Sequence, residues 1–310
     1  MDKLRSSRRK IGDDFFMKLA KNELRISITA ACNMKCVYCH NEGNTKMAML
    51  TKEQIRKIVE ASKDFELKKI RITGGEPLVS PYVEEICQML TEEYGISVEM
   101  NTNGIEIKKL LRMIKKGWLK KVVIGMDYFD KEISKNSPVG KSSAIIKNNI
   151  LEIKKTDCEV RIATVYNDDD ENTENIVRWA VDNDIGVRVL EIVREETDEE
   201  YSKRYMNLQK KIAADIELDW HIDSVMEELN GAKDGKVLVK FYHSLCRLGL
   251  CNLCRKVPFR ITSSGIARPC ILTSSTDVDL FDGSIRENIT KVMKQEININ
   301  KIRNSEIIIK

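Results

Sequence analysis

Short apolar runs recur along the chain and predict six β-strands. They cover residues 24–29 (LRISIT), 70–73 (IRIT), 96–101 (ISVEMN), 122–127 (VVIGMD), 160–166 (VRIATVY) and 187–192 (VRVLEI). Val and Ile dominate these runs, and β-branched residues favour the extended conformation. The segments between them carry apolar residues at helical spacing, so the pattern alternates strand and helix.

Local signals mark where some of the helices begin and end. Thr51 and Gln54 form a capping-box pattern before IRKIVEASKDF, and Ser80 and Pro81 precede a helical segment that Gly95 is placed to end. Six strand–helix units in strict alternation predict an α/β fold with a parallel sheet. Six units favour a partial (β/α)6 TIM-like barrel over a closed eight-stranded one, with ligands bound at the carboxyl ends of the strands.

The alternation stops near residue 195. We expect a charged lead-in at 1–22, the partial barrel at 23–195, and connecting helices followed by a smaller C-terminal domain at 196–310. The first forty residues of that last segment look like a charged connection with helical parts. FRIT, at 259–262, has a β-like pattern, whereas the tail beyond Cys270 predicts no particular element.

Composition excludes several classes of protein. The 310 residues are 42% hydrophobic and 32% charged, which permits a sizeable core and argues against global disorder. Lys and Arg exceed Asp and Glu by 52 to 48, a net charge of +4 that does not indicate stable binding to nucleic acid. No apolar stretch approaches the roughly 18 residues that span a bilayer, and no secretory signal follows the basic N-terminus. We therefore expect a cytoplasmic protein without a membrane partner.

The nine cysteines carry the clearest chemical signal. Their number is odd and no export signal is present, so a disulfide framework is disfavoured. Cys87 and Cys158 lie in a helical and a strand pattern and are expected to be buried apolar residues. The other seven fall into two tight groups, which is typical of metal ligands in a reducing compartment.

The first group is Cys32, Cys36 and Cys39, a C-x3-C-x2-C pattern directly after the first predicted strand. Three thiolates can hold three irons of a [4Fe–4S] cluster and leave the fourth iron open to another ligand. A structural zinc site would need four ligands, and His40 is adjacent to Cys39 and poorly placed to complete one. A zinc knuckle nevertheless remains an alternative for this group.

The second group comprises Cys246, Cys251, Cys254 and Cys270. Its core spacing is C-x2-C-x15-C, with one more cysteine five residues upstream. This spacing fits an iron–sulfur cluster, and by itself it also permits a four-cysteine zinc ribbon.

Two motifs together resemble the radical S-adenosylmethionine (radical SAM) superfamily. CNMKCVYC, at 32–39, is similar to its cluster loop, and ITGGEPL, at 72–78, is similar to its Gly-Gly-Glu-Pro segment. The resemblance implies a [4Fe–4S] cluster, S-adenosylmethionine and an electron donor such as flavodoxin or ferredoxin. It also implies that reductive cleavage yields a 5'-deoxyadenosyl radical, which abstracts hydrogen from a substrate. Cys32, Cys36 and Cys39 would then be catalytic, and the implied cofactor contacts are Tyr38, Gly74, Gly75, Glu76, Gly125 and Val193.

From about residue 22 to 272 the chain is most similar to one branch, the GTP 3',8-cyclases of molybdenum-cofactor biosynthesis. The matching segments are LRISITAACNMKCVYC, KIRITGGEPL, NTNG and CNLC…RIT…GIARPC. This resemblance implies a second [4Fe–4S] cluster in the C-terminal domain, held by cysteines of the second group, and a nucleotide substrate. The implied substrate contacts are Arg25, Lys69, Arg71, Thr102, Arg161 and Arg260.

Several departures from that branch surround the implied substrate. Cys246 could be a fourth thiol ligand where the branch has three, and Pro258 replaces an arginine. Gly125 stands for a serine, and the chain ends in SEIIIK instead of Gly-Gly. The first hypothesis is therefore a cyclase acting on a purine nucleotide. The alternatives are a radical SAM maturase of a peptide or other small molecule, and a non-enzymatic regulator that binds zinc or a cluster.

Overall fold

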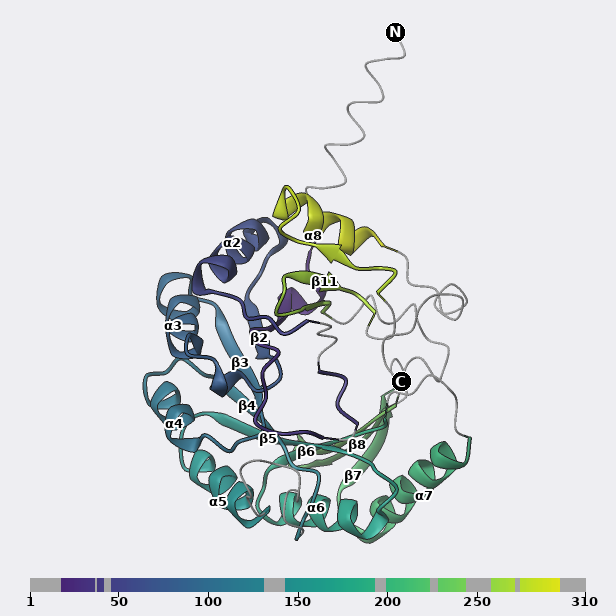
Figure 1. Ribbon diagram of the computed structural model, residues 1–310. Coiled ribbons are helices and arrows are strands. Elements are labelled where there is room, and N and C mark those ends of the chain that lie inside the picture. Colours follow the sequence, from purple (N-terminus) through teal and green to yellow (C-terminus); the bar gives the residue numbers. More distant parts are fainter. Residues whose placement is uncertain are drawn as a thin grey trace.

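The computed structural model describes residues 18–36, 38–41, 46–130, 143–192, 199–223, 228–243, 258–270 and 274–295 (Figure 1). Its central strands lie side by side in chain order and run parallel. They are β1 (Glu23–Ser27), β2 (Lys69–Thr73), β3 (Ser97–Thr102), β4 (Lys121–Gly125), β5 (Glu159–Val165) and β6 (Gly186–Leu190). The predicted α/β fold with a partial, TIM-like barrel is confirmed, since the described sheet does not close on itself.

A helix follows each of these strands and lies along the outer side of the curved sheet (Figure 1). These helices are α2 (Lys52–Ser62), α3 (Val83–Gln88), α4 (Ile107–Lys115), α5 (Ser143–Lys154), α6 (Asp170–Asp182) and α7 (Glu199–Asp215). The outward residues of the strands, such as Ile26, Ile72 and Met100, are almost completely buried beneath them. Each such side chain contributes roughly 1.5–3 kcal/mol of hydrophobic stabilisation, so the core lies between sheet and helices.

The capping box predicted for α2 is present. Thr51 Oγ1 accepts a hydrogen bond from the Gln54 amide at 3.2 Å, and Gln54 Oε1 accepts one from the Thr51 amide at 2.9 Å. The next helix, expected to begin at Ser80 and Pro81, begins at Val83, and a separate 3-10 turn precedes it at Pro77–Val79. The helix continues as a π-helical turn, η5 (Met89–Glu93), and the chain leaves it at Gly95 with φ of 64°.

Strands from the C-terminal part of the chain extend both edges of this sheet. On one edge β9 (Lys236–Tyr242) pairs in parallel with β6, and β8 (Glu228–Lys233) and β7 (Asp219–Asp223) follow in antiparallel order. On the other edge β10 (Arg260–Ile261) pairs in parallel with β1, followed by β11 (Ile266–Arg268) and β12 (Val278–Asp279). Helix α8 (Ile285–Lys294) comes last among the described elements.

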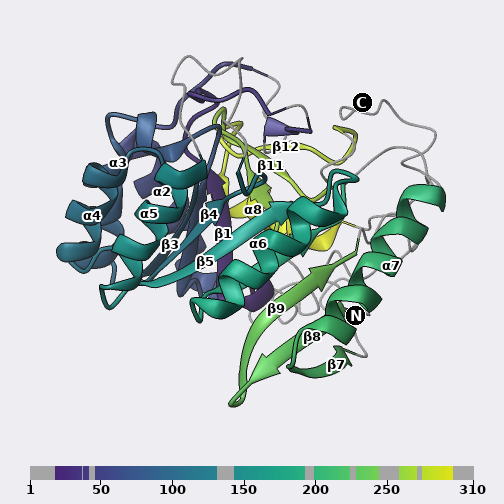
Figure 2. The same ribbon diagram turned by 90° about the horizontal axis from the view of Figure 1, so that it is seen from below.

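The segment expected to be a charged connection with helical parts therefore contains strands as well as α7. Figure 2 shows α7 beside β8 and β9, and the Tyr205 ring of α7 meets the Phe241 ring of β9 edge-on. Asp234 and Gly235, both with positive φ, form the two-residue turn between β8 and β9. An Asp-Gly pair is a strong hairpin signal, and here it lies between two strands that were not expected from the sequence.

The structure leaves the predicted domain boundaries near residues 22 and 195 untested. Residues 1–17, most of the expected lead-in, lie outside the described residues, and the division near residue 195 stays a prediction. None of the described helices has the length and apolar character that crossing a bilayer requires.

Candidate functional site

The loop after β1 carries the first cysteine group at the carboxyl end of the sheet. The Met34 amide donates to Cys32 Sγ and the Asn41 amide donates to Cys39 Sγ, each at 3.3 Å. Among the described residues no three ligating groups already stand as a metal site, so cluster binding would require these thiols to converge. Their chemistry and their place on one loop fit three ligands of a [4Fe–4S] cluster.

Two thiols of this loop, Cys32 and Cys36, have a raised pKa, which favours their protonated forms. Burial, with the negative charge of Asp127, raises the pKa of the Cys36 thiol to about 11. Burial also raises the pKa of Cys32. A metal ligand must be a thiolate, so binding a cluster would release these protons.

Gly74 and Gly75 let the loop after β2 lie directly on the start of the cysteine loop. The Gly75 amide donates to the Thr29 carbonyl at 2.7 Å, and the Glu76 amide donates to the Ala31 carbonyl at 2.8 Å. A Cβ on Gly75 would lie 2.3 Å from the Ala31 carbonyl oxygen, and one on Gly74 would lie 2.5 Å from that of Thr29. These glycines therefore fix the approach of two backbone segments immediately before Cys32.

Glu76 is buried and joins the ends of β2 and β3. Its carboxylate accepts hydrogen bonds from Thr102 Oγ1 at 2.7 Å, from the Asn103 amide at 2.7 Å and from the Leu78 amide at 3.0 Å. Burial raises its carboxyl pKa, and these hydrogen bonds oppose the shift. Thr102, an expected substrate contact, thus has its hydroxyl engaged by Glu76 and by the Gly104 amide.

The loops that follow β3 and β4 also contact the cysteine loop. Asn103 Nδ2, after β3, donates to Asn33 Oδ1 at 2.7 Å. Tyr38 reaches Asp127, which follows β4 two residues after Gly125. Sequence reasoning did not single out Asn33, Asn103 or Asp127, although each lies within or beside a motif it used.

The inner face of the sheet is charged. Register places Arg25, Arg71, Glu99 and Lys121 in one row across β1 to β4, with Arg260 of β10 beside Arg25. The alternate residues on the same strands form the apolar core. A parallel barrel with such a face presents a polar wall to whatever binds within it.

Three of the expected substrate contacts on this face are in ion pairs. Lys69 Nζ lies 2.6 Å from Glu23, and the Arg71 guanidinium lies 2.9 Å from Glu99 and 3.2 Å from Glu23. Arg161 Nε lies 2.5 Å from Glu159. The structure thus brings the expected cations together with carboxylates that sequence reasoning had not considered.

Arg188 of β6 is a further cation on this wall that sequence reasoning missed. Burial lowers its pKa, and the charges of Arg71, Arg25 and Arg161 lower it further. Its Nε is buried and has no hydrogen-bond partner in the described part of the chain. The sequence signal that could have identified Arg188 is the alternation in VRVL, which places Arg188 on the inward face of β6 as Arg161 is on that of β5.

Comparison with known proteins places this geometry in a family. Residues 26–180 match the Radical SAM superfamily, and this stretch runs from β1 through the cysteine loop to α6. The chain belongs to the radical SAM superfamily. Membership implies a [4Fe–4S] cluster and S-adenosylmethionine, in agreement with the three thiols of the loop after β1.

Relatives of this radical SAM enzyme include proteins named GTP 3',8-cyclase. The cyclase of Peptoclostridium acidaminophilum is 31% identical over 303 residues, which cover 91% of this chain and 90% of that protein. The cyclase of Alkaliphilus oremlandii is 29% identical over 293 residues, covering 88% and 87%. Among solved structures, Streptococcus suis SuiB bound to the precursor peptide SuiA aligns with a TM-score of 0.68 at 16% identity, covering 96% of this chain and 70% of SuiB. At that identity the likeness concerns the fold alone.

The second cysteine group of the radical SAM chain falls mostly outside the described residues. Cys246, Cys251, Cys254 and the expected cofactor contact Val193 lie there. Cys270 is described and is buried just after β11. The neighbouring Arg268 is also buried, and its Nε lies 2.8 Å from Asp277, which anchors the approach to Cys270. The second cluster stays a prediction.

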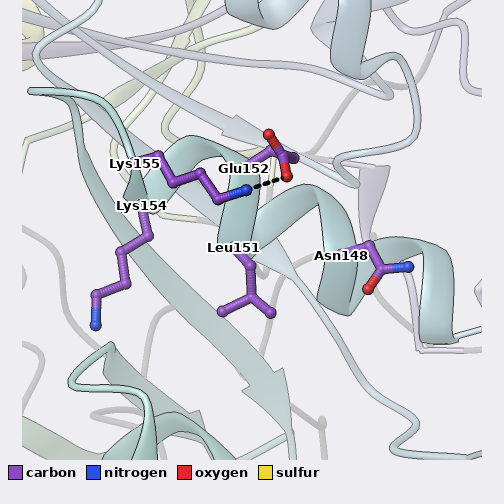
Figure 3. Close-up of a pocket in the computed structure, with 5 residues that line it drawn as sticks. All are labelled: Asn148, Leu151, Glu152, Lys154 and Lys155. Atoms are coloured by element: carbon purple, nitrogen blue, oxygen red, sulfur yellow. Dashed lines mark hydrogen bonds and ion pairs between the residues drawn. The ribbon is translucent and has the colours of Figure 1, made fainter.

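A hollow on the outside of the radical SAM barrel is separate from this site. It has a volume of about 590 Å³ and is lined by residues of α5 and its end: Asn148, Leu151, Glu152, Lys154 and Lys155 (Figure 3). Helix α5 lies on the outer side of the sheet (Figure 1). The cysteine loop and the loop of Gly74 and Gly75 instead follow the carboxyl ends of β1 and β2.

Proposed function

We propose that this radical SAM enzyme catalyses a GTP 3',8-cyclase-like cyclisation of a purine nucleotide. The observation that carries the proposal is the gathering of Arg25, Arg71, Arg161 and Arg188 on the inner wall of the barrel. Guanidinium groups match phosphate oxygens with forked hydrogen bonds, so such a wall suits an anionic substrate. Similarity to proteins named GTP 3',8-cyclase over about nine tenths of the chain supports the same substrate class.

The residues of the site divide the work of this reaction between them. Cys32, Cys36 and Cys39 would hold the cluster, and the contacts of Gly75 and Glu76 would fix the position of their loop. With S-adenosylmethionine, the bound cluster would supply the power to abstract a hydrogen atom from carbon. The arginines would hold the phosphates and so set which ribose carbon faces the cofactor, and the product would join ribose C3' to C8 of the purine.

Further parts of the proposal concern partners and location. Cys246, Cys251, Cys254 and Cys270 would hold a second [4Fe–4S] cluster in the C-terminal part of the chain. An electron donor such as flavodoxin or ferredoxin would reduce the enzyme in the cytoplasm. The product would enter molybdenum-cofactor biosynthesis, as the branch resemblance implies.

The deciding experiment is anaerobic turnover of the reconstituted, reduced enzyme with S-adenosylmethionine and GTP. We expect 5'-deoxyadenosine and a cyclised nucleotide to appear together, and mass spectrometry detects both products. A reaction without nucleotide measures uncoupled cofactor cleavage, and GDP and GMP replace GTP in parallel reactions. Cofactor cleavage that no purine nucleotide accelerates, with no nucleotide consumed, would overturn the proposal and leave the peptide or small-molecule maturase as the next candidate.

A further inference from the structure

Two buried carboxylates lie beside Arg71 and Lys69 on the inner wall. Glu23 of β1 is 2% exposed and Glu99 of β3 is 9% exposed. They hold Arg71 between them, with shortest distances of 3.2 Å from Glu23 and 2.9 Å from Glu99. Lys69 also lies within 2.6 Å of Glu23 and 3.5 Å of Glu99. Removing such ionic groups from water is unfavourable, so their pairing must satisfy most of their charge.

The wall is therefore uneven in charge. Around β2 and β3, Arg71 and Lys69 are matched by carboxylates from the same sheet. Around β6, Arg188 has no ion pair in the described residues and its Nε has no hydrogen bond. Its neighbours are paired: Arg161 and Lys121 with the half-exposed Glu159, and Lys240 of β9, which lies opposite Arg188, with the buried Glu228. A bound anion would gain most at Arg188, whose charge no carboxylate of the described residues matches.

Glu23 and Glu99 would also repel the negative charge of a long polyphosphate. A phosphate reaching Arg71 would have to displace a carboxylate already bound to it and would lie beside that negative charge. Like charges placed together in a poorly hydrated site are an effective means of rejecting a competing ligand. Each further phosphate on the ligand increases this repulsion, whereas the nucleoside part is unaffected.

Resting on the proposed function, we propose that Glu23 and Glu99 are specificity-determining residues that make this enzyme prefer a purine nucleoside mono- or diphosphate to a triphosphate. They keep Arg71 and Lys69 occupied, so that Arg188 forms the main anion site together with Arg161, whose partner Glu159 is half exposed and more easily displaced than the buried Glu23 and Glu99. The inner wall would then accept a shorter phosphate chain than a wall without these two carboxylates, on which Arg71 and Lys69 would also be available.

The test compares binding of GMP, GDP and GTP to the full chain, reconstituted with iron and sulfide and saturated with S-adenosylmethionine, by calorimetry. The wild type should bind GMP or GDP more tightly than GTP. Glu99→Gln keeps the shape of the side chain and removes its charge, so it should raise the GTP-to-GMP affinity ratio about tenfold. Glu23→Gln provides a second variant in case loss of one carboxylate impairs folding.

Two further variants separate specificity from general electrostatics. In Glu99→Gln/Arg71→Met the freed guanidinium is absent, so the ratio should return to within about threefold of the wild-type value. Glu152→Gln removes a carboxylate from an exposed ion pair with Lys155 on α5 and should leave the ratio unchanged (Figure 3). Glu152→Gln is the same chemical change as Glu99→Gln, but it lies on α5, outside the inner wall.

The outcomes distinguish this inference from the function on which it rests. Preferential binding of GTP by the wild type, or an unchanged ratio in both folded glutamine variants, would overturn the specificity role while leaving a nucleotide cyclase intact. Absence of binding by every purine nucleotide, together with absence of nucleotide consumption, would overturn the proposed function and this inference together.

Discussion

The hydroxyl of Tyr38 donates a hydrogen bond to Oδ2 of Asp127, joining the cysteine loop to the end of β4. Asp127 is itself held from two directions. Its Oδ1 accepts the Val165 amide at 2.9 Å, and its backbone carbonyl accepts Asn172 Nδ2 at 2.8 Å. Asn172 also accepts the Phe129 amide at 2.8 Å, so the carboxylate is a fixed anchor between β4, β5 and α6. The loop that carries Cys36 and Cys39 is thereby positioned by a residue more than eighty positions away.

Tyr38→Phe tests this anchor by removing one hydroxyl. The ring and its packing are kept, but Asp127 loses a donor in a buried environment, and such a loss typically costs about 1–3 kcal/mol. We expect the free energy of unfolding, measured with urea, to fall by that amount. Tyr82→Phe is the matched control, because Tyr82 is exposed and its hydroxyl has no hydrogen bond in the described structure. Equal stability of the two variants would contradict the anchoring role.

Gly75→Ala should disturb the cysteine loop through sterics alone. The added methyl would lie 2.3 Å from the Ala31 carbonyl oxygen and 2.6 Å from that of Ala30, so the backbone before Cys32 must move. Overpacking of this kind costs about 1–3 kcal/mol, and the displaced loop should bind less iron after anaerobic reconstitution. Gly125→Ala is the stability control, since its methyl would meet nothing nearer than the Thr102 carbonyl oxygen at 3.9 Å. Wild-type iron content in Gly75→Ala would refute the steric account.

The barrel strands were predictable because their two faces differ in chemistry. Ile26 and Ile72 point to the helices, whereas Arg25 and Arg71 point inward, and this alternation is visible in the sequence. The Asp-Gly turn before β9 and the apolar run VLV within β9 are visible too, whereas β7 (DWHID) and β8 (ELNGAK) have few apolar residues. Local patterns thus identify elements whose faces contrast and give little signal for mainly polar strands such as β7 and β8.

Partners that are distant in sequence could not be predicted. The cysteine spacing and the Gly-Gly-Glu-Pro segment identified the site, because their residues are adjacent along the chain. The carboxylate of Glu76 is instead bound by Thr102 and Asn103, and Arg71 is bound by Glu23 and Glu99. No local pattern encodes these contacts, since they depend on the register between strands.

Glu174 gives a pH-dependent contribution to the docking of α6 on α7. Its carboxylate lies 2.6 Å from Lys211 Nζ and 2.7 Å from the Arg178 guanidinium, and the hydrogen bond from Lys211 is the main reason its pKa lies below the ordinary value. A lowered pKa in the folded state stabilises the fold above the ordinary carboxyl pKa, and this stabilisation is lost as pH falls through the lowered value.

Glu174→Gln should therefore reduce the free energy of unfolding at neutral pH by more than it does in acid. We expect the difference from wild type to shrink as pH falls from about 5 to about 3, measured by urea unfolding. Glu217→Gln is the control, because that side chain is exposed and has no ion pair in the described residues. A difference that grows in acid would contradict the assignment of the lowered pKa to Glu174.

Cys36→Ala tests the cluster ligands directly. One iron would lose its thiolate, so the loop could no longer hold a [4Fe–4S] cluster with a single open iron, and cleavage of S-adenosylmethionine should be abolished. The measurements are iron content and 5'-deoxyadenosine formation after anaerobic reconstitution and reduction. Cys87→Ala is the control, because Cys87 is completely buried on α3 and should lose only packing energy while retaining iron and cleavage. Stoichiometric zinc without iron in anaerobically purified wild type, or 5'-deoxyadenosine from Cys36→Ala at the wild-type rate, would overturn the cluster assignment, because neither is compatible with three thiolates holding an open iron.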